Sequence, residues 1–385
     1  MLAIINGTVY TMNGPTIPKG IVLVDDGKIL QVGSDIDLPK QAEIIDATGK
    51  FVMPGLIDAH THVGIMEETY RIEGDDTNET ADPVTPHLRA VDAVNPADLG
   101  FLDALAGGVT TVVTGPGSAN IIGGEMVIMK TAGIVVDEMI IRFPAGLKCA
   151  LGENPKRVYG NGNKMPVTRM ASAALLRETL VAAQTYQEKI HRAAKENSLP
   201  PERNLKMEAV VRVLQREIPL RVHAHRADDI MTAIRIAKEF QLELVIEHCT
   251  EGHLIAPQLA AAGVKAIVGP IISNRAKVEL MNRSLATAMT LYDKGIPFAI
   301  MTDHPVVPIN LLSLSASLAV KGGLPEEEAL KAITINAAKL LNIDDRVGSL
   351  ETGKDADVII TDKPLFDPKH QVERVFVNGC PVLAI

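Results

Sequence analysis

Histidine pairs separated by one residue occur twice in this 385-residue chain and are its most distinctive chemical feature. His60 and His62 end one apolar segment, and His223 and His225 end another. Side chains two positions apart in a strand lie on the same face, so each pair presents two imidazoles in one direction. Neighbouring imidazoles are typical zinc ligands, and the alternative for His60 and His62 is a pair of surface histidines in a hairpin.

Two further apolar segments also end in residues that can bind a metal. His248 follows residues 244–247, and Asp303 follows residues 298–302. Buried histidine and aspartate side chains cost free energy unless they are paired or bound to a metal. The histidines and Asp303 together predict a site for one or two divalent first-row metal ions, and zinc is the expected metal.

The segments that carry these residues alternate with helical segments through the middle of the chain. The predicted strands cover residues 52–62, 110–115, 126–131, 146–151, 220–225, 244–250, 265–270 and 297–303. The predicted helices cover residues 95–106, 168–197, 228–240, 254–262, 284–294 and 325–341. Eight strands followed by helices or loops are typical of an α/β TIM barrel, whose active site lies at the carboxyl ends of the strands.

Both ends of the chain are rich in short β-strands and in turn dipeptides such as Asp26-Gly27 and Asn378-Gly379. Small isolated hairpins are only marginally stable, so we expect the two ends to combine. The sequence therefore predicts a small composite β-sandwich domain of residues 1–51 and 342–385, and a (β/α)8 barrel of residues 52–341.

The composition excludes several classes of function. The chain has 38 Lys+Arg against 47 Asp+Glu, a net charge of −9, which disfavours nucleic acid and anionic membranes as partners. Sparse cysteines, the missing secretory signal and the lack of a long apolar run favour a cytoplasmic protein without a transmembrane helix. Only 3% of residues are aromatic, so we expect a small polar substrate. A homo-oligomer is expected only because many soluble enzymes form one.

Two motifs resemble the amidohydrolase superfamily. PGLIDAHTH at residues 54–62 resembles its opening motif, and VGSLETGKDADV at residues 347–358 resembles its C-terminal return strand. The resemblance covers essentially the whole chain. It is closest to the imidazolonepropionase-related branch, which also holds Xaa-Pro dipeptidases, and it implies the same barrel with a bipartite sandwich.

The resemblance also implies roles for the candidate ligands. His60 and His62 would bind the more buried metal, and His223 and His248 would bind the other. Asp303 would bind the first metal and act as the general base.

A two-metal site of this family also needs a bridging anion, which is commonly a carbamylated lysine at the end of the fourth strand. Lys148 matches that position, and carbamylation would turn it into a carboxylate. Some members use a glutamate of the third strand instead, and Glu125 is the candidate here. The alternatives are an ordinary ion-paired lysine at 148 and a solvated carboxylate at 125.

Metal chemistry then predicts hydrolysis of a C–N bond in an amide, a peptide-like compound or a cyclic amide, rather than an ester-specific reaction. A metal-activated hydroxide would attack the carbonyl carbon, and Asp303 would pass the proton to the leaving nitrogen. His225 is a second catalytic candidate that would stabilise the oxyanion or orient the substrate. A hydrogen bond to a metal ligand is the alternative role for His225.

Substrate-binding candidates follow the fourth predicted strand. Asn154, Lys156 and Arg157 lie in the segment 152–157, and the two cations could bind a substrate carboxylate. The alternative is a solvated loop. The acidic segment 67–82 is either a lid over the site or another solvated loop.

Two other functions stay open. A mononuclear deaminase or an imidazolonepropionase-type ring hydrolase would carry a glutamate three positions after the histidine of strand five, where this chain has Arg226. This difference favours a binuclear, peptidase-like enzyme. A metal-free binding or scaffold relative would have lost ligands, whereas every expected ligand type is present here.

Overall fold

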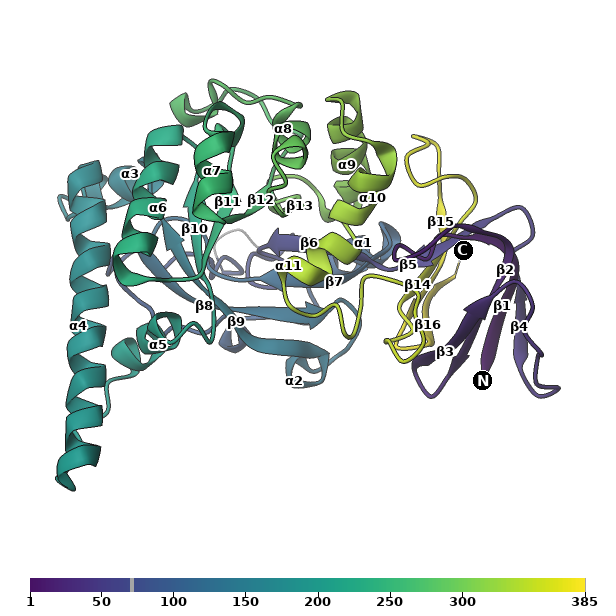
Figure 1. The fold of residues 1–385 in the computed structure, drawn as a ribbon, viewed down its shortest axis with the longest axis horizontal. Helices are drawn as coiled ribbons and strands as arrows, with labels where there is room; N and C mark the ends of the chain where they lie inside the picture. The colour runs from purple at the N-terminus through teal and green to yellow at the C-terminus, as the bar shows by residue number, and fades with distance from the viewer. Residues whose placement is uncertain (70–72, 385) are drawn as a thin grey trace.

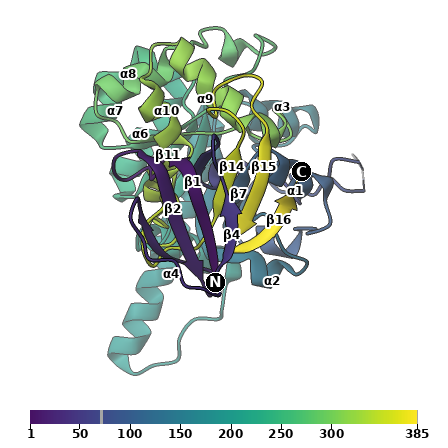
Figure 2. The same ribbon diagram turned by 90° about the vertical axis from the view of Figure 1, so that its right-hand side faces the viewer.

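The computed structural model describes residues 1–69 and 73–384, which form two eight-stranded sheets with helices packed mainly around one of them (Figure 1). One sheet comes from the middle of the chain. The other joins strands from both ends, as Figure 2 shows, so that the N- and C-termini belong to the same layer.

The middle sheet is a nearly closed α/β barrel of the TIM type. Its strands, in order around the sheet, are β6 (Leu56–Thr61), β7 (Val109–Thr114), β8 (Ile122–Lys130), β9 (Ile140–Ala150), β10 (Leu220–Ala224), β11 (Leu244–His248), β12 (Lys265–Val268) and β13 (Phe298–Ile300). The first and last strands meet through backbone hydrogen bonds, because Asp303 N–H donates to His60 O at 3.2 Å and His62 N–H donates to His304 O at 2.8 Å. The sequence prediction of eight barrel strands is therefore confirmed.

One barrel strand runs against the expected direction. β8 is antiparallel to both β7 and β9, whereas the other neighbouring pairs from β9 to β13, and β6 with β7, are parallel. Only residues 115–121 connect β7 to β8, which is too short for the crossover of about a dozen residues that a parallel pair requires. The barrel predicted from the sequence therefore departs at β8 from the all-parallel sheet that is typical of a TIM barrel.

Helices surround the barrel (Figure 1). They are α1 (Leu99–Ala106), α2 (Val136–Met139), α3 (Glu153–Asn161), α4 (Arg169–Glu196), α5 (Leu205–Leu214), α6 (Ala227–Phe240), α7 (Ala256–Ala262), α8 (Thr287–Asp293), α9 (Leu312–Lys321), α10 (Glu326–Ala332) and α11 (Ile335–Leu340). Short 3₁₀ helices are η1 (Ala90–Asp92), η2 (Gly252–Leu254), η3 (Val278–Leu280) and η4 (Ile309–Leu311). None of the helices within 1–69 and 73–384 is both long and apolar enough to cross a membrane.

The second sheet has the order β16-β15-β14-β5-β1-β2-β3, and β4 pairs with β1. Its strands are β1 (Leu2–Val9), β2 (Ile17–Asp25), β3 (Lys28–Gly33), β4 (Glu43–Asp46), β5 (Phe51–Pro54), β14 (Val358–Thr361), β15 (Val372–Val377) and β16 (Cys380–Ala384). The two ends meet where β5 pairs with β14, with Val52 opposite Ile360. The ends do combine, while the two-layered sandwich and the domain limits stay predictions.

A tight bend at Gly55 separates the two sheets. The single strand predicted for residues 52–62 is in fact β5 in the terminal sheet followed by β6 in the barrel. A Cβ atom at Gly55 would lie 2.1 Å from Thr110 Oγ1, so only glycine fits this close approach. The bend therefore places β6, and the histidines at its end, inside the barrel.

Candidate metal centre

The first ligand group joins the ends of β6 and β13. His60 Nε2 lies 3.2 Å from Asp303 Oδ1, and His62 Nε2 lies 3.5 Å from the same oxygen. All three side chains are buried or nearly so. Asp303 adopts a left-handed backbone conformation (φ 59°), which is uncommon for a residue other than glycine and is typical of functional sites.

The second group joins the ends of β10 and β11. His223, His225 and His248 have ring centroids 4.3 to 4.7 Å apart, and their candidate ligand atoms lie within 4.8 Å of one another. The rings of His60 and His248 lie 5.9 Å apart, so the two groups face a common space. The six side chains that the sequence placed at strand ends thus form two neighbouring groups, each able to hold a metal ion.

The orientation of the rings fits metal binding. His62 Nδ1 lies 2.8 Å from Gly115 O, and His248 Nδ1 lies 2.9 Å from Gly269 O. His225 Nδ1 lies 2.7 Å from Thr250 Oγ1. An acceptor on one ring nitrogen fixes the orientation of the ring and leaves the other nitrogen for a metal, which is how metal-binding histidines are usually held.

Burial keeps the second group neutral. Desolvation lowers the pKa of His223, His225 and His248 well below the usual value, and the neighbouring charges within the group, such as that of His225 on His223, lower it further. Neither ring nitrogen of His223 has a hydrogen-bond partner among the described residues. Neutral imidazoles with a free nitrogen are the form that binds zinc, so these residues fit a divalent ion.

Beneath the ligands lies a buried charged cluster of Lys148, Arg221 and Glu247. Lys148 forms an ion pair with Glu247, and its Nζ lies 3.4 Å from His60 Nε2. Glu247 Oε1 accepts a hydrogen bond from Arg221 Nε at 2.9 Å and lies 3.1 Å from His60 Nδ1. Burial alone would raise the pKa of Glu247, but the charges of His60, Lys148 and Arg221 outweigh it and hold that pKa well below its usual range.

The sequence analysis identified Lys148 but missed Arg221 and Glu247. Strict strand alternation places Glu247 on the face opposite to its neighbour His248. His248 has a φ of 66°, and this left-handed turn lets both side chains reach the interior of the barrel. Arg221 precedes His223 by two residues and therefore shares its face, which is a signal that the sequence did contain.

The alternative bridging residue lies elsewhere. Glu125 is buried on β8, where its Oε1 accepts a hydrogen bond from Arg212 Nη1 on α5 at 2.8 Å. Desolvation raises the pKa of this carboxyl group, and the charge of Arg212 opposes the increase. The structure brings Lys148, and not Glu125, to the histidines.

The predicted substrate-binding residues lie on α3, directly after β9. Asn154 is buried, donates to Ser118 Oγ at 2.8 Å and accepts from Lys277 Nζ at 3.1 Å. Lys156 is half-buried and Arg157 is exposed, and no hydrogen bond or ion pair within the described ranges joins either one to the histidines. Of the acidic segment 67–82, residues 70–72 lie outside the described residues.

Asp58 fixes the closure of the barrel next to the first ligand group. Its carboxylate accepts hydrogen bonds from Thr302 Oγ1 at 2.5 Å and from the backbone N–H groups of Thr302 and His60. Desolvation raises the pKa of Asp58 to about 7, although these hydrogen bonds partly oppose it. Asp58 therefore ties β6 to the chain that carries Asp303.

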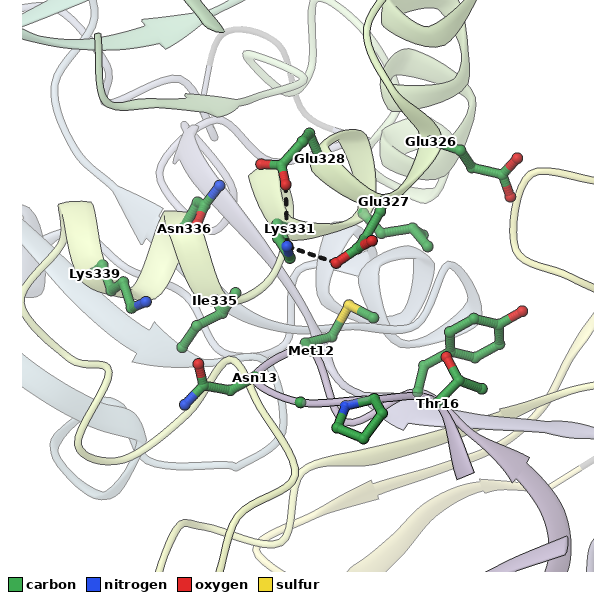
Figure 3. Close-up of a pocket in the computed structure, with 14 residues that line it drawn as sticks. Met12, Asn13, Thr16, Glu326, Glu327, Glu328, Lys331, Ile335, Asn336 and Lys339 are labelled. Carbon is green, nitrogen blue, oxygen red and sulfur yellow. Dashed lines mark hydrogen bonds and ion pairs between the residues drawn. The ribbon is translucent and has the colours of Figure 1, made fainter. Parts of the chain in front are cut away.

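A separate surface cavity of about 770 Å³ lies between residues 10–16, which connect β1 to β2, and the helices α10 and α11. Figure 3 shows Lys331 at its wall, paired with Glu327 and Glu328 at 2.6 and 3.0 Å. These charged groups satisfy one another, and none of the ligand histidines lines the cavity. The candidate metal centre therefore lies at the strand ends of the barrel and not in this surface cavity.

Comparison with known proteins agrees with this arrangement. A family model described as the amidohydrolase family matches residues 51–382. The amidohydrolase TasK of Hapsidospora irregularis is 28% identical over 391 residues, which is 94% of this chain but only 39% of TasK. The imidazolonepropionase of Sphingopyxis alaskensis is 27% identical over 97% of this chain and 94% of its own length.

Solved structures extend the comparison. An amidohydrolase from Thermotoga maritima MSB8 is 45% identical and aligns over 100% of both chains with a TM-score of 0.98. A prolidase complexed with N-methylphosphonate-L-proline, at 18% identity and a TM-score of 0.62, shares the fold. The family model covers most of the chain, and the barrel carries the ligand groups that the motifs implied. This chain belongs to the amidohydrolase family.

Proposed function

We propose that this protein is a metal-dependent hydrolase that cleaves a C–N bond in a small polar amide, peptide-like compound or cyclic amide. The observation that carries the proposal is the pair of facing ligand groups at the strand ends, with the Nδ1 atoms of three histidines held by acceptors. Similarity to an imidazolonepropionase and a shared fold with a prolidase support C–N chemistry.

We assign one divalent ion, with zinc as the expected metal, to His60, His62 and Asp303 and a second to the group of His223 and His248. Lys148 is the proposed bridge in a carbamylated form, and its Nζ position 3.4 Å from His60 Nε2 supports that assignment. Carbamylation would exchange a cation for an anion beside Glu247.

The loss of that cation can be tolerated because Glu247 has a second partner. Arg221 donates to Glu247 Oε1 at 2.9 Å and to Ala59 O at 2.7 Å. The guanidinium group stays charged at all physiological pH values, so Glu247 would remain paired when Lys148 is modified.

Bound divalent ions lower the pKa of water to roughly 7 and polarise a substrate carbonyl. Water then adds its OH to the carbonyl carbon as the C–N bond breaks, and its proton ends on the leaving nitrogen. Asp303 lies between the two imidazoles of its group and is placed to carry that proton. His225 Nε2 faces the same space, where it can stabilise the oxyanion or hold a metal.

Substrate recognition is assigned to the start of α3. Asn154, Lys156 and Arg157 follow the end of β9 at the face of the barrel that holds the ligands. We propose that the cations bind a carboxylate of the substrate while Asn154 orients the loop through Ser118 and Lys277.

Imidazolone ring opening or deamination is the second candidate, because imidazolonepropionases and a deaminase are among the relatives. The position of the expected catalytic glutamate is occupied by Arg226, which pairs with the surface residue Asp228 at 2.9 Å. A metal-free scaffold role finds no support, because each ligand group has three side chains that could hold a metal ion.

A substrate screen tests the proposed function. Zinc-loaded protein should release amine from members of a panel of N-acyl amino acids, dipeptides and cyclic amides, and a chelator should stop the reaction. Asp303→Asn should lower the rate by about 10²–10⁴-fold, as expected for the loss of a proton-transfer group. Hydrolysis of lactones alone, or rates unaffected by both changes, would contradict the proposal.

A further inference from the structure

Glu279 lies on the 3₁₀ helix η3 that follows β12, and its side chain is completely buried against the second ligand group. The segment shows no periodicity that would mark Glu279 as a site residue, and neither the motifs nor the family resemblance include it. Its surroundings among the described residues indicate a role at the metal centre.

The two carboxylate oxygens of Glu279 differ in their contacts. Oε2 accepts a hydrogen bond from the backbone N–H of Glu153 at 3.2 Å. Oε1 has no hydrogen-bond partner in the described part of the chain. It lies 3.8 Å from His223 Nε2 and 3.7 Å from His225 Nε2, so an oxygen without a hydrogen bond and two imidazole nitrogens lie close together.

These separations suit a common metal. Zinc binds imidazole nitrogen and carboxylate oxygen at roughly 2.0–2.2 Å with tetrahedral geometry, which puts neighbouring ligand atoms about 3.4 Å apart. Direct hydrogen bonds would require separations near 2.9 Å. The observed distances are therefore too long for hydrogen bonds and close to those of two ligands on one ion.

The charges of the two ligand groups also support a metal-binding role for Glu279. The first ligand group contains the carboxylate of Asp303, whereas His223, His225 and His248 contribute imidazole rings and no carboxylate. Glu279 would give the second group a carboxylate of its own, in addition to the proposed bridge at Lys148. Each group would then combine imidazoles with one carboxylate.

Lys277 offers the competing explanation, as its Nζ lies 3.7 Å from Glu279 Oε1. That distance is too long for a hydrogen bond, and the hydrogen bond that Lys277 Nζ does make goes to Asn154 Oδ1 at 3.1 Å. Lys277 is also partly exposed, so its charge does not by itself compensate the charge of the fully buried Glu279 carboxylate.

We propose that Glu279 is a ligand of the second metal ion, which it shares with His225 and with the already assigned His223 and His248. The inference rests on the proposed metal-dependent function and adds a carboxylate ligand to it. It also assigns His225 to the metal rather than to the oxyanion.

Metal titration of the full-length, metal-free chain tests the inference. Cobalt(II) is the probe, followed by calorimetry and by visible absorption, which reports the number and type of ligands independently of activity. Wild type should bind two ions. Glu279→Gln keeps the size and the acceptor for Glu153 N–H, and it should weaken one of the two sites by at least about tenfold while changing its absorption spectrum.

Glu251→Gln is the matched control. Glu251 is also buried, but both of its oxygens accept hydrogen bonds, from Ala227 N–H at 2.7 Å and from Asn282 Nδ2 at 2.9 Å. This variant should bind both ions as wild type does. If circular dichroism shows that Glu279→Gln does not fold, Glu279→Asp provides the same comparison with a shortened carboxylate.

The outcomes separate the two proposals. Two sites of wild-type affinity and unchanged spectrum in the Glu279 variants would overturn the inference and leave the proposed hydrolase function intact. Failure of wild type itself to bind cobalt or zinc would overturn both. An equal loss in the Glu251 control would also overturn the inference, because the effect would then follow from any buried carboxylate.

Discussion

Individual histidines at the centre depend on acceptors that do not themselves bind a metal. Carbonyl oxygens hold Nδ1 of His62 and His248, and the hydroxyl group of Thr250 holds Nδ1 of His225. Such acceptors set the direction of the ring and raise its basicity. The hydroxyl group is the only one of these three acceptors that a substitution can remove directly.

Thr250→Val should therefore impair the centre without removing a ligand. The variant keeps the side-chain volume but loses the acceptor 2.7 Å from His225 Nδ1, so we expect a loss of about 10–100-fold in metal affinity or in hydrolysis. Calorimetric titration with zinc measures the change. Thr290→Val, which removes only a hydrogen bond to Ala286 O within α8, should behave like wild type, and equal affinities in both variants would contradict the account.

The buried charged cluster of Lys148, Arg221 and Glu247 should contribute strongly to the free energy of unfolding. Arg221→Met would remove the guanidinium group that pairs with the buried Glu247 and would also remove the bond to Ala59 O, so we expect a loss of about 3–5 kcal/mol in the free energy of unfolding. Arg226→Met, at a partly exposed pair with Asp228, should cost less than about 1 kcal/mol. Urea unfolding compares the two variants, and similar losses would show that the buried cluster has no special role.

Elements were predictable where a short local signal determines them. The helix predicted for residues 168–197 is α4 (Arg169–Glu196), which lies between its N-cap Thr168, whose side chain accepts from Ala171 N–H, and its left-handed C-cap Asn197. The start of α1 was placed too early, because the cap is Asp98 rather than Asn95. The direction of β8 and the position of Glu279 depend on connections and tertiary contacts, which periodicity does not contain.

Hydrogen bonds beside the terminal sheet connect segments from opposite ends of the chain. Glu351 accepts from Asn13 Nδ2 at 2.9 Å and pairs with Lys354 Nζ at 2.8 Å, and it also accepts from Ser349. Burial would raise the pKa of Glu351, but these partners outweigh it and lower the pKa to about 2. A lowered pKa stabilises the fold above the unfolded value near 4.5, and the stabilisation is lost as the pH falls toward 2.

Glu351→Gln should remove this pH-dependent contribution. Because the side chain is 38% exposed, we expect a loss of about 1 kcal/mol or less at pH 7. The difference from wild type should shrink as the pH falls from about 4.5 to about 2. Urea unfolding at several pH values measures it, and a difference that grows with acidification would contradict the assignment.

The whole molecule is a barrel whose chain starts and ends in one outer sheet (Figure 2). Lys130 on β8 is buried between Asp355 and Asp357 at 3.0 and 2.7 Å, and this contact ties the barrel to the segment before β14. The strand-end histidines and the joining of the two ends were predictable from residue types and spacing. A cytoplasmic location and a homo-oligomer stay predictions.

Metal content per chain tests the central claim most directly. Protein purified without chelators and then exposed to zinc should contain about two equivalents of metal by elemental analysis, and chelation should remove both the metal and the hydrolysis. Less than about half an equivalent, with no gain on adding zinc, would contradict the account.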